Sequence, residues 1–263
     1  MILISSKKVE QNEQLILNEL EKRDRMNTEE AAALLKASHS TVRRLFTKLE
    51  QQGDVVRTFG GICRNSGTSA DYSFIELDSH NQEAKERIAQ QASVIIKNGD
   101  TIYLDGGTTM ARLAAELTTL LRSNELKNIN IFTNSIVNLN ILKNDCPVSL
   151  IGGNYKPNRQ DFSGFLAEES IKLLHFSKCF LGSDAFEPKS GFTGTDFDAA
   201  RLNSLVIASS DFRYMLIDSS KFGKASMVKF ADLSHISMII TDTGLDETWR
   251  QSVEKLGGTL KLS

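Results

Sequence analysis

Cysteine is scarce in this 263-residue chain, which has only Cys63, Cys146 and Cys179. These cysteines are scattered, without paired spacing and without a nearby histidine, so the sequence argues against a disulfide framework and against a zinc site. The chain also lacks an apolar run of about 20 residues, the length that crosses a bilayer, and it lacks an apolar signal-peptide core near its start. We therefore expect a cytoplasmic protein with no metal, no cofactor and no membrane partner.

A strong charge of one sign is absent as well. The net charge is −2, and the first 66 residues carry 11 Lys and Arg against 9 Asp and Glu. Such a balance neither indicates nor excludes a protein that binds nucleic acid. What is present is ordinary for a soluble globular protein, with 40% hydrophobic and 24% charged residues. The length allows one large domain, or a small and a medium one.

Three short amphipathic helices are predicted in the first sixty residues. Their buried stripes are expected to consist of Val9, Ile16, Leu17 and Leu20, then of Ala31, Leu34 and Leu35, and then of Val42, Leu45, Phe46 and Leu49. Asn27 or Thr28 is expected to cap the second helix, and Gly53 to end the third. Two short helices joined by a tight turn, with a helix before them, are the pattern of a helix-turn-helix module.

The third helix carries hydroxyl and cationic side chains on its outward face. Such groups suit contacts with phosphates and base edges in the major groove of DNA. Residues 55–64 place β-branched residues around a Gly-Gly turn and predict a small hairpin, or wing, whose arginines can contact the DNA backbone. The alternative is a solvated helix face, which is what most charged faces are. The candidate DNA-binding residues are Ser40, Thr41, Arg43, Arg44, Thr47, Lys48 and Arg57.

Residues 41–46 read Thr-Val-Arg-Arg-Leu-Phe, and residues 57–62 read Arg-Thr-Phe-Gly-Gly-Ile. The first segment resembles the Thr-Ile-Arg-Arg-Asp-Leu of the reader helix in the DeoR family of bacterial transcriptional regulators. The second resembles the Arg-x-His-Gly-Gly-Ala at the end of that family's wing. The arginines match, whereas Leu45 replaces the family's acid and Phe59 its histidine. The resemblance therefore implies operator DNA as a partner, but not the contacts that those two family residues make.

Strands and helices alternate in the rest of the chain. Strands are predicted at 102–104, 129–133, 148–151, 179–181, 214–217, 238–240 and 259–262, and helices at 82–94, 111–121, 136–142, 166–174, 199–209 and 247–256. This alternation is typical of an α/β domain with a mostly parallel sheet that is covered on both faces. We expect a winged helix-turn-helix domain at residues 1–64, a polar linker at 65–78, and an effector-sensing α/β domain at 79–263.

Polar residues follow five of the predicted strands. Ligands of such sheets bind outside the carboxyl ends of the strands, so these residues are expected to share one rim. The loop at 105–109 runs into a helix whose first amides can hold an anion, Lys221 offers a point charge for phosphate, and Asp105 and Asp184 can accept hydrogen bonds from hydroxyls. Each alone is also ordinary turn chemistry. The candidate effector-binding residues are Asp105, Gly106, Gly107, Thr108, Thr109, Thr133, Asn134, Ser135, Gly152, Gly153, Asp184 and Lys221.

The same strand ends resemble the signatures of the DeoR effector domain. The family's Asp-x-Gly-Thr-Thr, Thr-Asn-Ser, Gly-Gly and Asp-Ser-Ser-Lys-Phe-Gly are met at 105–109, 133–135, 152–153 and 218–223. The resemblance implies a fold similar to ribose-5-phosphate isomerase and the sugar-phosphate sensors, with a phosphorylated sugar or related metabolite as effector. Three residues depart from it: Leu77 replaces an arginine, Ala185 a glycine and Asn203 a lysine. Asn203 thus leaves Lys221 as the main cation that the sequence assigns to the pocket.

The sequence therefore predicts a DNA-binding transcriptional regulator, a repressor of a carbohydrate-use operon, whose operator binding changes with a phosphorylated sugar. It is expected to act as a homodimer or homotetramer on repeated half-sites, and not as an enzyme. The alternative is a sugar-phosphate isomerase-like enzyme fused to a DNA-binding module, with Asp105, Asp184 or Glu168 as the base. A scaffold protein is a third interpretation, against which Arg43 and Arg44 on the reader face weigh.

Overall fold

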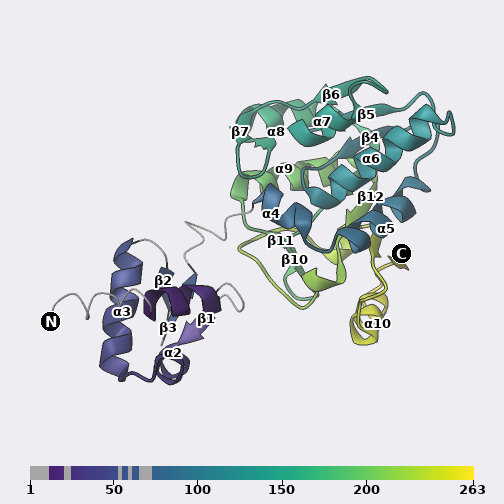
Figure 1. The fold of residues 1–263 in the computed structure, drawn as a ribbon. Helices are drawn as coiled ribbons and strands as arrows, with labels where there is room; N and C mark the ends of the chain where they lie inside the picture. Colours follow the sequence, from purple (N-terminus) through teal and green to yellow (C-terminus); the bar gives the residue numbers. More distant parts are fainter. Residues whose placement is uncertain (1–11, 21–24, 53–54, 59–60, 65–72) are drawn as a thin grey trace. The chain divides into compact units, whose positions relative to one another are not determined.

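The computed structural model describes residues 12–20, 25–52, 55–58, 61–64 and 73–263. The chain divides into two compact units, Met1–Asp71 and Tyr72–Ser263 (Figure 1). Among the described residues, no helix is long and apolar enough to cross a membrane.

The described part of the first unit combines helices with a three-stranded sheet. A helix at 12–20 is followed by β1 (Arg25–Asn27), α2 (Thr28–Leu35), α3 (His39–Gln52), β2 (Val55–Thr58) and β3 (Gly61–Arg64). The hairpin of β2 and β3 is the predicted wing. β1 pairs antiparallel with β3 and so adds a third strand to the hairpin. The sequence did not predict this strand; it predicted only that the first helix would end near Lys22 to Arg25.

Local sequence explains how α2 and α3 form. The side chain of Asn27 accepts a hydrogen bond from Glu30 N at 2.8 Å, and the Glu30 carboxylate accepts one from Asn27 N at 2.8 Å. This reciprocal capping box fixes the start of α2, as predicted for Asn27. The predicted stripe of α3 is confirmed, because its members are at most 7% exposed: Val42, Leu45, Phe46 and Leu49. The stripe of α2 is narrower than predicted, since Leu34 is 38% exposed. Val9 and Gly53 lie outside the described residues.

The second unit is built on a seven-stranded parallel sheet (Figure 1). Its strands in spatial order are β15 (Leu260–Leu262), β14 (Met238–Thr241), β12 (Ser210–Leu216), β9 (Phe176–Leu181), β4 (Thr101–Leu104), β5 (Asn130–Thr133) and β6 (Val148–Leu150). Every neighbouring pair is parallel, which confirms the predicted sheet. The chain leaves β4 outward through β5 and β6 and returns to β9 on the other side of β4. Open α/β sheets bind ligands at such a reversal of strand order.

Helices cover both faces of this sheet, as predicted. One core contains side chains from α5 (Gln82–Ser93), α6 (Thr108–Arg122) and α7 (Ile136–Leu142), and the other contains side chains from α8 (Phe165–Lys172), α9 (Phe197–Ala208) and α10 (Glu247–Lys255). The central strand β4 shows why both faces need cover. Ile102 and Leu104 are buried in the first core, and Tyr103 between them is buried in the second.

Short antiparallel strands, which the sequence did not predict, are added to the parallel sheet. β7 (Asn154–Lys156) pairs with β8 (Asp161–Ser163), and a separate sheet contains β10 (Ala185–Glu187), β11 (Gly191–Gly194) and β13 (Val228–Ala231). With only three or four residues each, these strands show too little alternation to be recognised. They matter for function because the loops after β7 and β11 reach the site described below.

The second unit begins earlier than the sequence suggested. The last residues of the predicted linker, 65–78, form part of α4 (Phe74–Ser79), which belongs to the second unit. Phe74 is only 7% exposed, and its backbone N donates a hydrogen bond to Asn158 O at 2.8 Å. Burial of this apolar side chain explains why the segment is ordered as a helix rather than extended as a spacer.

Candidate effector pocket and DNA-reading helix

A cavity that is partly open to solvent lies at the carboxyl ends of β4 and β9. Its walls come from segments that are far apart in the sequence: the α4–α5 region, the loop after β4, the β7–β8 loop, the loop after β9, the loop after β11, and the turn η1 (Ser219–Lys221). Seven of the predicted effector-binding residues line it: Asp105, Gly106, Gly107, Thr108, Thr109, Asp184 and Lys221.

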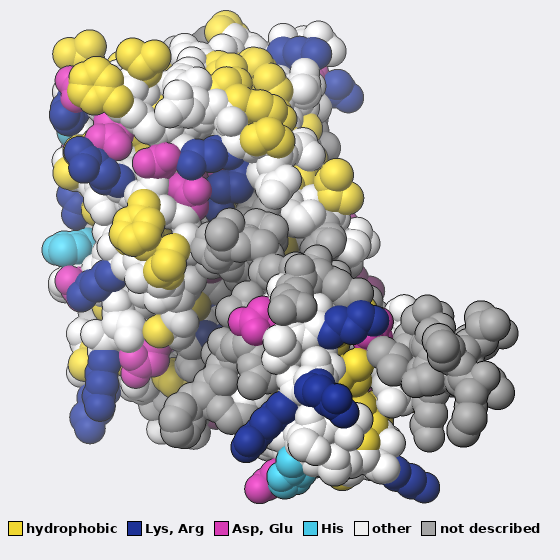
Figure 2. All heavy atoms as spheres, turned by 90° about the vertical axis from the view of Figure 1, so that its left-hand side faces the viewer, with side chains coloured by type: hydrophobic (Ala, Val, Ile, Leu, Met, Phe, Trp, Pro, Cys, Tyr) yellow, Lys and Arg dark blue, Asp and Glu magenta, His cyan; other side chains and the backbone are white. Residues whose placement is uncertain are grey.

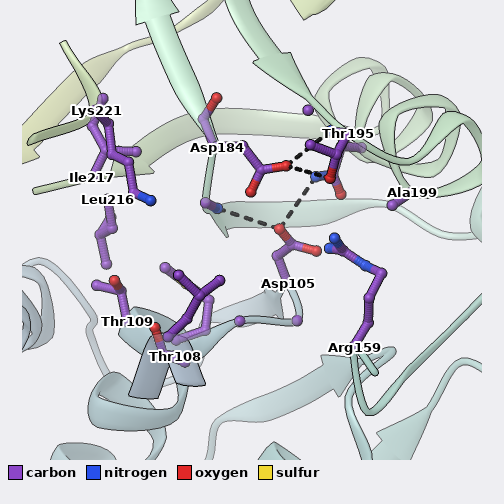
Figure 3. A pocket seen from close by; sticks show the side chains of 18 of the residues that line it. Asp105, Thr108, Thr109, Arg159, Asp184, Thr195, Ala199, Leu216, Ile217 and Lys221 are labelled. Atoms are coloured by element: carbon purple, nitrogen blue, oxygen red, sulfur yellow. Dashed lines mark hydrogen bonds between the residues drawn. The ribbon is translucent and has the colours of Figure 1, made fainter. Parts of the chain in front are cut away.

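The two glycines after β4 are required by the backbone. Gly107 precedes α6 with φ of 117°, a conformation that residues with a side chain rarely adopt. A β-carbon on Gly106 would lie 2.7 Å from Asp161 Oδ2, so a larger residue would collide with that buried carboxyl. The loop thereby presents the start of α6, with Thr108 and Thr109, to the cavity (Figure 3). A helix N-terminus attracts anions.

Three cations line the cavity, where the sequence had assigned mainly Lys221. Lys85 comes from α5 and Arg159 from the β7–β8 loop. Lys85 is 4% exposed, and burial lowers the pKa of its ammonium group while the charge of Asp218 opposes that shift. The sequence did contain a signal for Lys85, because it lies three and four residues before Ile88 and Ala89, within the buried stripe of α5. Arg159 offered no such signal.

Asp105 lies at the bottom of the loop and is 4% exposed. Its Oδ2 accepts hydrogen bonds from Asn203 Nδ2 at 3.2 Å and from Gly182 N at 3.3 Å (Figure 3). Burial raises the pKa of Asp105 to about 7; the positive charge of Arg159 opposes this shift, and the neighbouring Asp161 adds to it. This carboxyl group therefore changes its charge near neutral pH.

Asp184 enters the cavity from the loop after β9. Its Oδ2 accepts hydrogen bonds from the backbone N and the hydroxyl of Thr195, at 2.9 and 3.0 Å. In Figure 3 its second oxygen points into the cavity, on the same side as Asp105 and Arg159. Lys221, Thr108 and Thr109 lie on the other side. The cavity thus has carboxylate acceptors at one end, and an ammonium group and a helix N-terminus at the other.

Five of the described residues that were predicted to bind the effector do not line the cavity: Thr133, Asn134, Ser135, Gly152 and Gly153. Thr133 is fully buried, and its hydroxyl donates to Leu104 O at 2.7 Å. The neighbouring Asn138 Nδ2 donates to Asp105 O at 2.9 Å and to Thr133 Oγ1 at 3.1 Å. A β-carbon on Gly153 would lie 2.6 Å from Ser163 O. These five residues lie at strand ends as predicted, but they pack against the loops that form the cavity and do not line the cavity itself.

The departures from the family pattern have different consequences. Leu77 and Asn203 both line the cavity, and Asn203 holds the carboxylate of Asp105. Ala185 is 4% exposed and begins β10, where its carbonyl accepts a hydrogen bond from the Ser183 hydroxyl at 2.8 Å. Among the described residues, no group of three or more His, Cys, Asp or Glu side chains is placed to hold a metal ion.

The proposed reader face of α3 is exposed. Six of the candidate DNA-binding residues are solvent-exposed there: Ser40, Thr41, Arg43, Arg44, Thr47 and Lys48. Lys48 forms an ion pair with Glu13 of the helix at 12–20, which leaves Arg43 and Arg44 as the more accessible cations of this face. The side chains of Arg57 and Phe59 lie outside what the structure describes. Leu45, in place of the family's acid, is buried in the core of the unit and is not part of the exposed face of α3.

Comparison with known proteins gives two family matches. Residues 13–68 match the DeoR-like helix-turn-helix domain, and residues 80–243 match the DeoR C-terminal sensor domain. An uncharacterised helix-turn-helix transcriptional regulator of Bacillus subtilis (strain 168) is 31% identical over 87% of this chain and 89% of its own length. The lactose phosphotransferase system repressor of Streptococcus mutans is 31% identical over 87% of this chain and 90% of its own length.

Solved structures resemble the chain more distantly. A D-ribose-5-phosphate isomerase in complex with phospho-erythronic acid aligns with a TM-score of 0.42 at 18% identity, over 54% of each chain. The delta subunit of eIF2B from Chaetomium thermophilum aligns with a TM-score of 0.42 at 13% identity, over 80% of this chain and 67% of that one.

Proposed function

Because the chain belongs to the DeoR family of transcriptional regulators, we propose that it represses a carbohydrate-use operon and that a phosphorylated sugar alters its binding to operator DNA. One observation carries the proposal: the N-terminus of α6, Lys85 and Lys221 meet at one cavity. A helix N-terminus and two ammonium groups together suit the charge of a phosphate group.

The other end of the cavity supports a sugar rather than a bare anion. Asp105 and Asp184 supply carboxylate oxygens there, and carboxylates accept hydrogen bonds from hydroxyl groups. A compound with a phosphate at one end and several hydroxyls at the other satisfies both halves of the cavity.

A thermal-shift panel of pentose and hexose phosphates, each beside its unphosphorylated parent, tests this proposal. A ligand at about 100 times its dissociation constant should stabilise the folded state by about 2.7 kcal/mol. We expect one or more phosphorylated compounds to stabilise the protein, their parents to have little effect, and the same compounds to weaken operator binding. Absence of any effect of phosphorylated sugars on both stability and operator binding contradicts the proposal.

Homo-oligomerisation belongs to the same proposal, since one reader helix contacts only one half-site of an operator. Large apolar side chains are exposed on α8 and at the start of α9: Phe165 is 70%, Leu166 65% and Phe197 65% exposed. Figure 2 shows hydrophobic side chains, in yellow, on the upper part of one face. Exposed apolar patches of this kind are typical of protein interfaces. We expect Phe165→Glu to shift the sedimentation of the protein toward the monomer and to weaken operator binding.

The enzyme alternative has one observation in its favour. A buried carboxyl group with a pKa of about 7, such as that of Asp105, is suited to general base catalysis at neutral pH. Turnover of a sugar phosphate by the wild-type protein, lost in Asp105→Asn, would support it. Binding of the same compound without turnover would leave the pocket as a sensor.

A further inference from the structure

The hairpin of β7 and β8 carries Arg159 into the cavity, on the side opposite Lys221 (Figure 3). Arg159 Nε donates to Asp161 Oδ2 at 3.0 Å, and the two side chains are 12% and 1% exposed. Burial raises the pKa of Asp161, and the positive charge of Arg159 opposes that shift. The buried carboxylate therefore fixes the guanidinium group at the cavity wall, and the guanidinium group favours the charged form of the carboxylate.

The tip of this hairpin is attached to three other elements. Gln160 O accepts a hydrogen bond from Ile136 N at the start of α7, at 3.1 Å, and Asn158 O accepts one from Phe74 N at the start of α4, at 2.8 Å. Lys156 pairs with two carboxylates at the start of α9, at 3.2 and 2.9 Å. Arg159 thus projects from a well-supported loop, so a ligand that contacts it pays little to order the hairpin.

The groups around Arg159 determine what a ligand has to offer at this end of the cavity. A guanidinium group donates hydrogen bonds and accepts none. Asp105 and Asp184 lie on the same side of the cavity and offer carboxylate oxygens, which accept hydrogen bonds (Figure 3). A hydroxyl group suits both kinds of neighbour, because its oxygen accepts from one while its hydrogen is donated to the other. A cationic amino group suits only the carboxylates, and a CH₂ group suits neither.

We propose that Arg159 is a specificity-determining residue that binds the oxygen of one sugar hydroxyl of the effector, and that Asp161 positions it for this contact. The inference rests on the proposed function and adds the group that distinguishes a sugar from its deoxy and amino counterparts. A site that is built to hydrogen-bond a hydroxyl rejects the analogue that lacks it, because the polar groups of the site are then left unpaired. Loss of one hydrogen bond to a charged group lowers affinity by about 10- to 150-fold.

Calorimetric titration of the full-length protein tests the inference. The probes are the pentose or hexose phosphate that stabilises the wild type most in the thermal-shift panel, and the monodeoxy analogues of that compound, each lacking one hydroxyl group. Arg159→Met should bind the parent compound about 10- to 150-fold more weakly than the wild type does. For the analogue that lacks the hydroxyl facing Arg159, variant and wild type should have equal affinities. Lys156→Met is the matched control, because Lys156 is an ion-paired cation of the same hairpin outside the described lining of the cavity, and it should bind as the wild type does.

The outcomes separate recognition of a hydroxyl from a structural role of Arg159. Equal affinities of Arg159→Met and Lys156→Met for the parent compound overturn the inference and leave the proposed function intact. A loss of the same size for the parent and for every deoxy analogue also overturns it, because Arg159 would then only support the cavity wall. No binding of any phosphorylated sugar by the wild type overturns the proposed function as well. If Arg159→Met does not fold because Asp161 is left as a buried charge, a double variant that adds Asp161→Asn removes that charge and should show the same selective loss.

Discussion

The indole of Trp249 covers the α-carbon of Gly223, two residues after Lys221. A β-carbon on Gly223 would lie 2.6 Å from Trp249 Cζ2, and the φ of Gly223 is 70°. Trp249 on α10 is the only tryptophan in the chain. The Trp249 ring therefore packs against the segment that follows the Lys221 turn and restrains its position. A movement of that turn is expected to alter the fluorescence of Trp249.

Gly223→Ala is expected to displace this turn, since the new methyl group meets the indole and the backbone conformation favours glycine. A cost of about 1–3 kcal/mol in the free energy of unfolding is expected from strain and overlap together. Gly99→Ala is the matched control, because Gly99 has φ of 85° but nothing within 4 Å of an added β-carbon. Urea denaturation measures both. Equal destabilisation of the two variants would show that the indole contact contributes nothing.

Lys221→Ala is expected to bind operator DNA normally and to respond poorly to the effector. Loss of one hydrogen bond to a charged group costs about 1.5–3 kcal/mol, which corresponds to a loss of about 10- to 150-fold in effector affinity. Titration of Trp249 fluorescence measures this affinity. Lys224→Ala is the control, because Lys224 is exposed in the same loop outside the cavity. Equal affinities of the two variants would remove Lys221 as an anchor.

Replacement of Arg43 and Arg44 by Ala is expected to weaken operator binding without unfolding the second unit. Each arginine that contacts a phosphate contributes about one unit to the slope of binding against salt concentration, so the slope should flatten as well. Fluorescence anisotropy of labelled operator DNA at several salt concentrations measures both effects. Lys127→Ala, an exposed charge removed from the second unit, is the control. Unchanged affinity and slope in the double variant would exclude α3 as the reader.

Asp105→Asn is expected to change how stability depends on pH. The folded-state pKa of Asp105, about 7, lies above the ordinary value of 3.8, so the folded protein holds a proton that the unfolded chain has released between these values. The wild type therefore loses this contribution to stability as pH rises from about 4 to about 7, and the loss levels off above that. The variant lacks this loss. The free energy of unfolding of the variant, relative to that of the wild type, should therefore increase over this pH range. A difference between the two proteins that does not change with pH would contradict the raised pKa of Asp105.

Much of the architecture could be predicted because it depends on local or periodic features. The local pair Asn27 and Glu30 indicates where α2 begins. Three adjacent strand-forming residues before the Gly-Gly turn predict β4. The cavity was only partly predictable. Asp105 directly follows β4 and Lys221 lies in the turn after β12, and both were found, whereas Arg159 lies in a short hairpin whose position is set by tertiary contacts.

The polar strand ends gave a mixed result for a physical reason. Thr133 is the last residue of a parallel strand and Asp105 directly follows one, but Thr133 donates to Leu104 O within the sheet while Asp105 lines the cavity. Sequence places both residues at one rim, yet it does not distinguish a side chain that binds its neighbours from one that faces a ligand. Lys85 is the reverse case, since its position in the buried stripe of α5 could have been recognised from the sequence but was not.

The chain forms β5 and β6 on one side of β4 before it forms β9 on the other side. This strand order also determines when the cavity can form during synthesis of the chain. Asp105 receives a hydrogen bond from Gly182, and the cavity is closed by Lys221, more than a hundred residues after the loop that it faces. The described elements of the first unit are complete by Arg64. Domains generally fold as units, from the N-terminus onward, at about 5–20 residues per second. A nascent chain is therefore expected to fold its first unit well before the cavity of the second unit is complete, and this cavity is expected to be among the last structures to form.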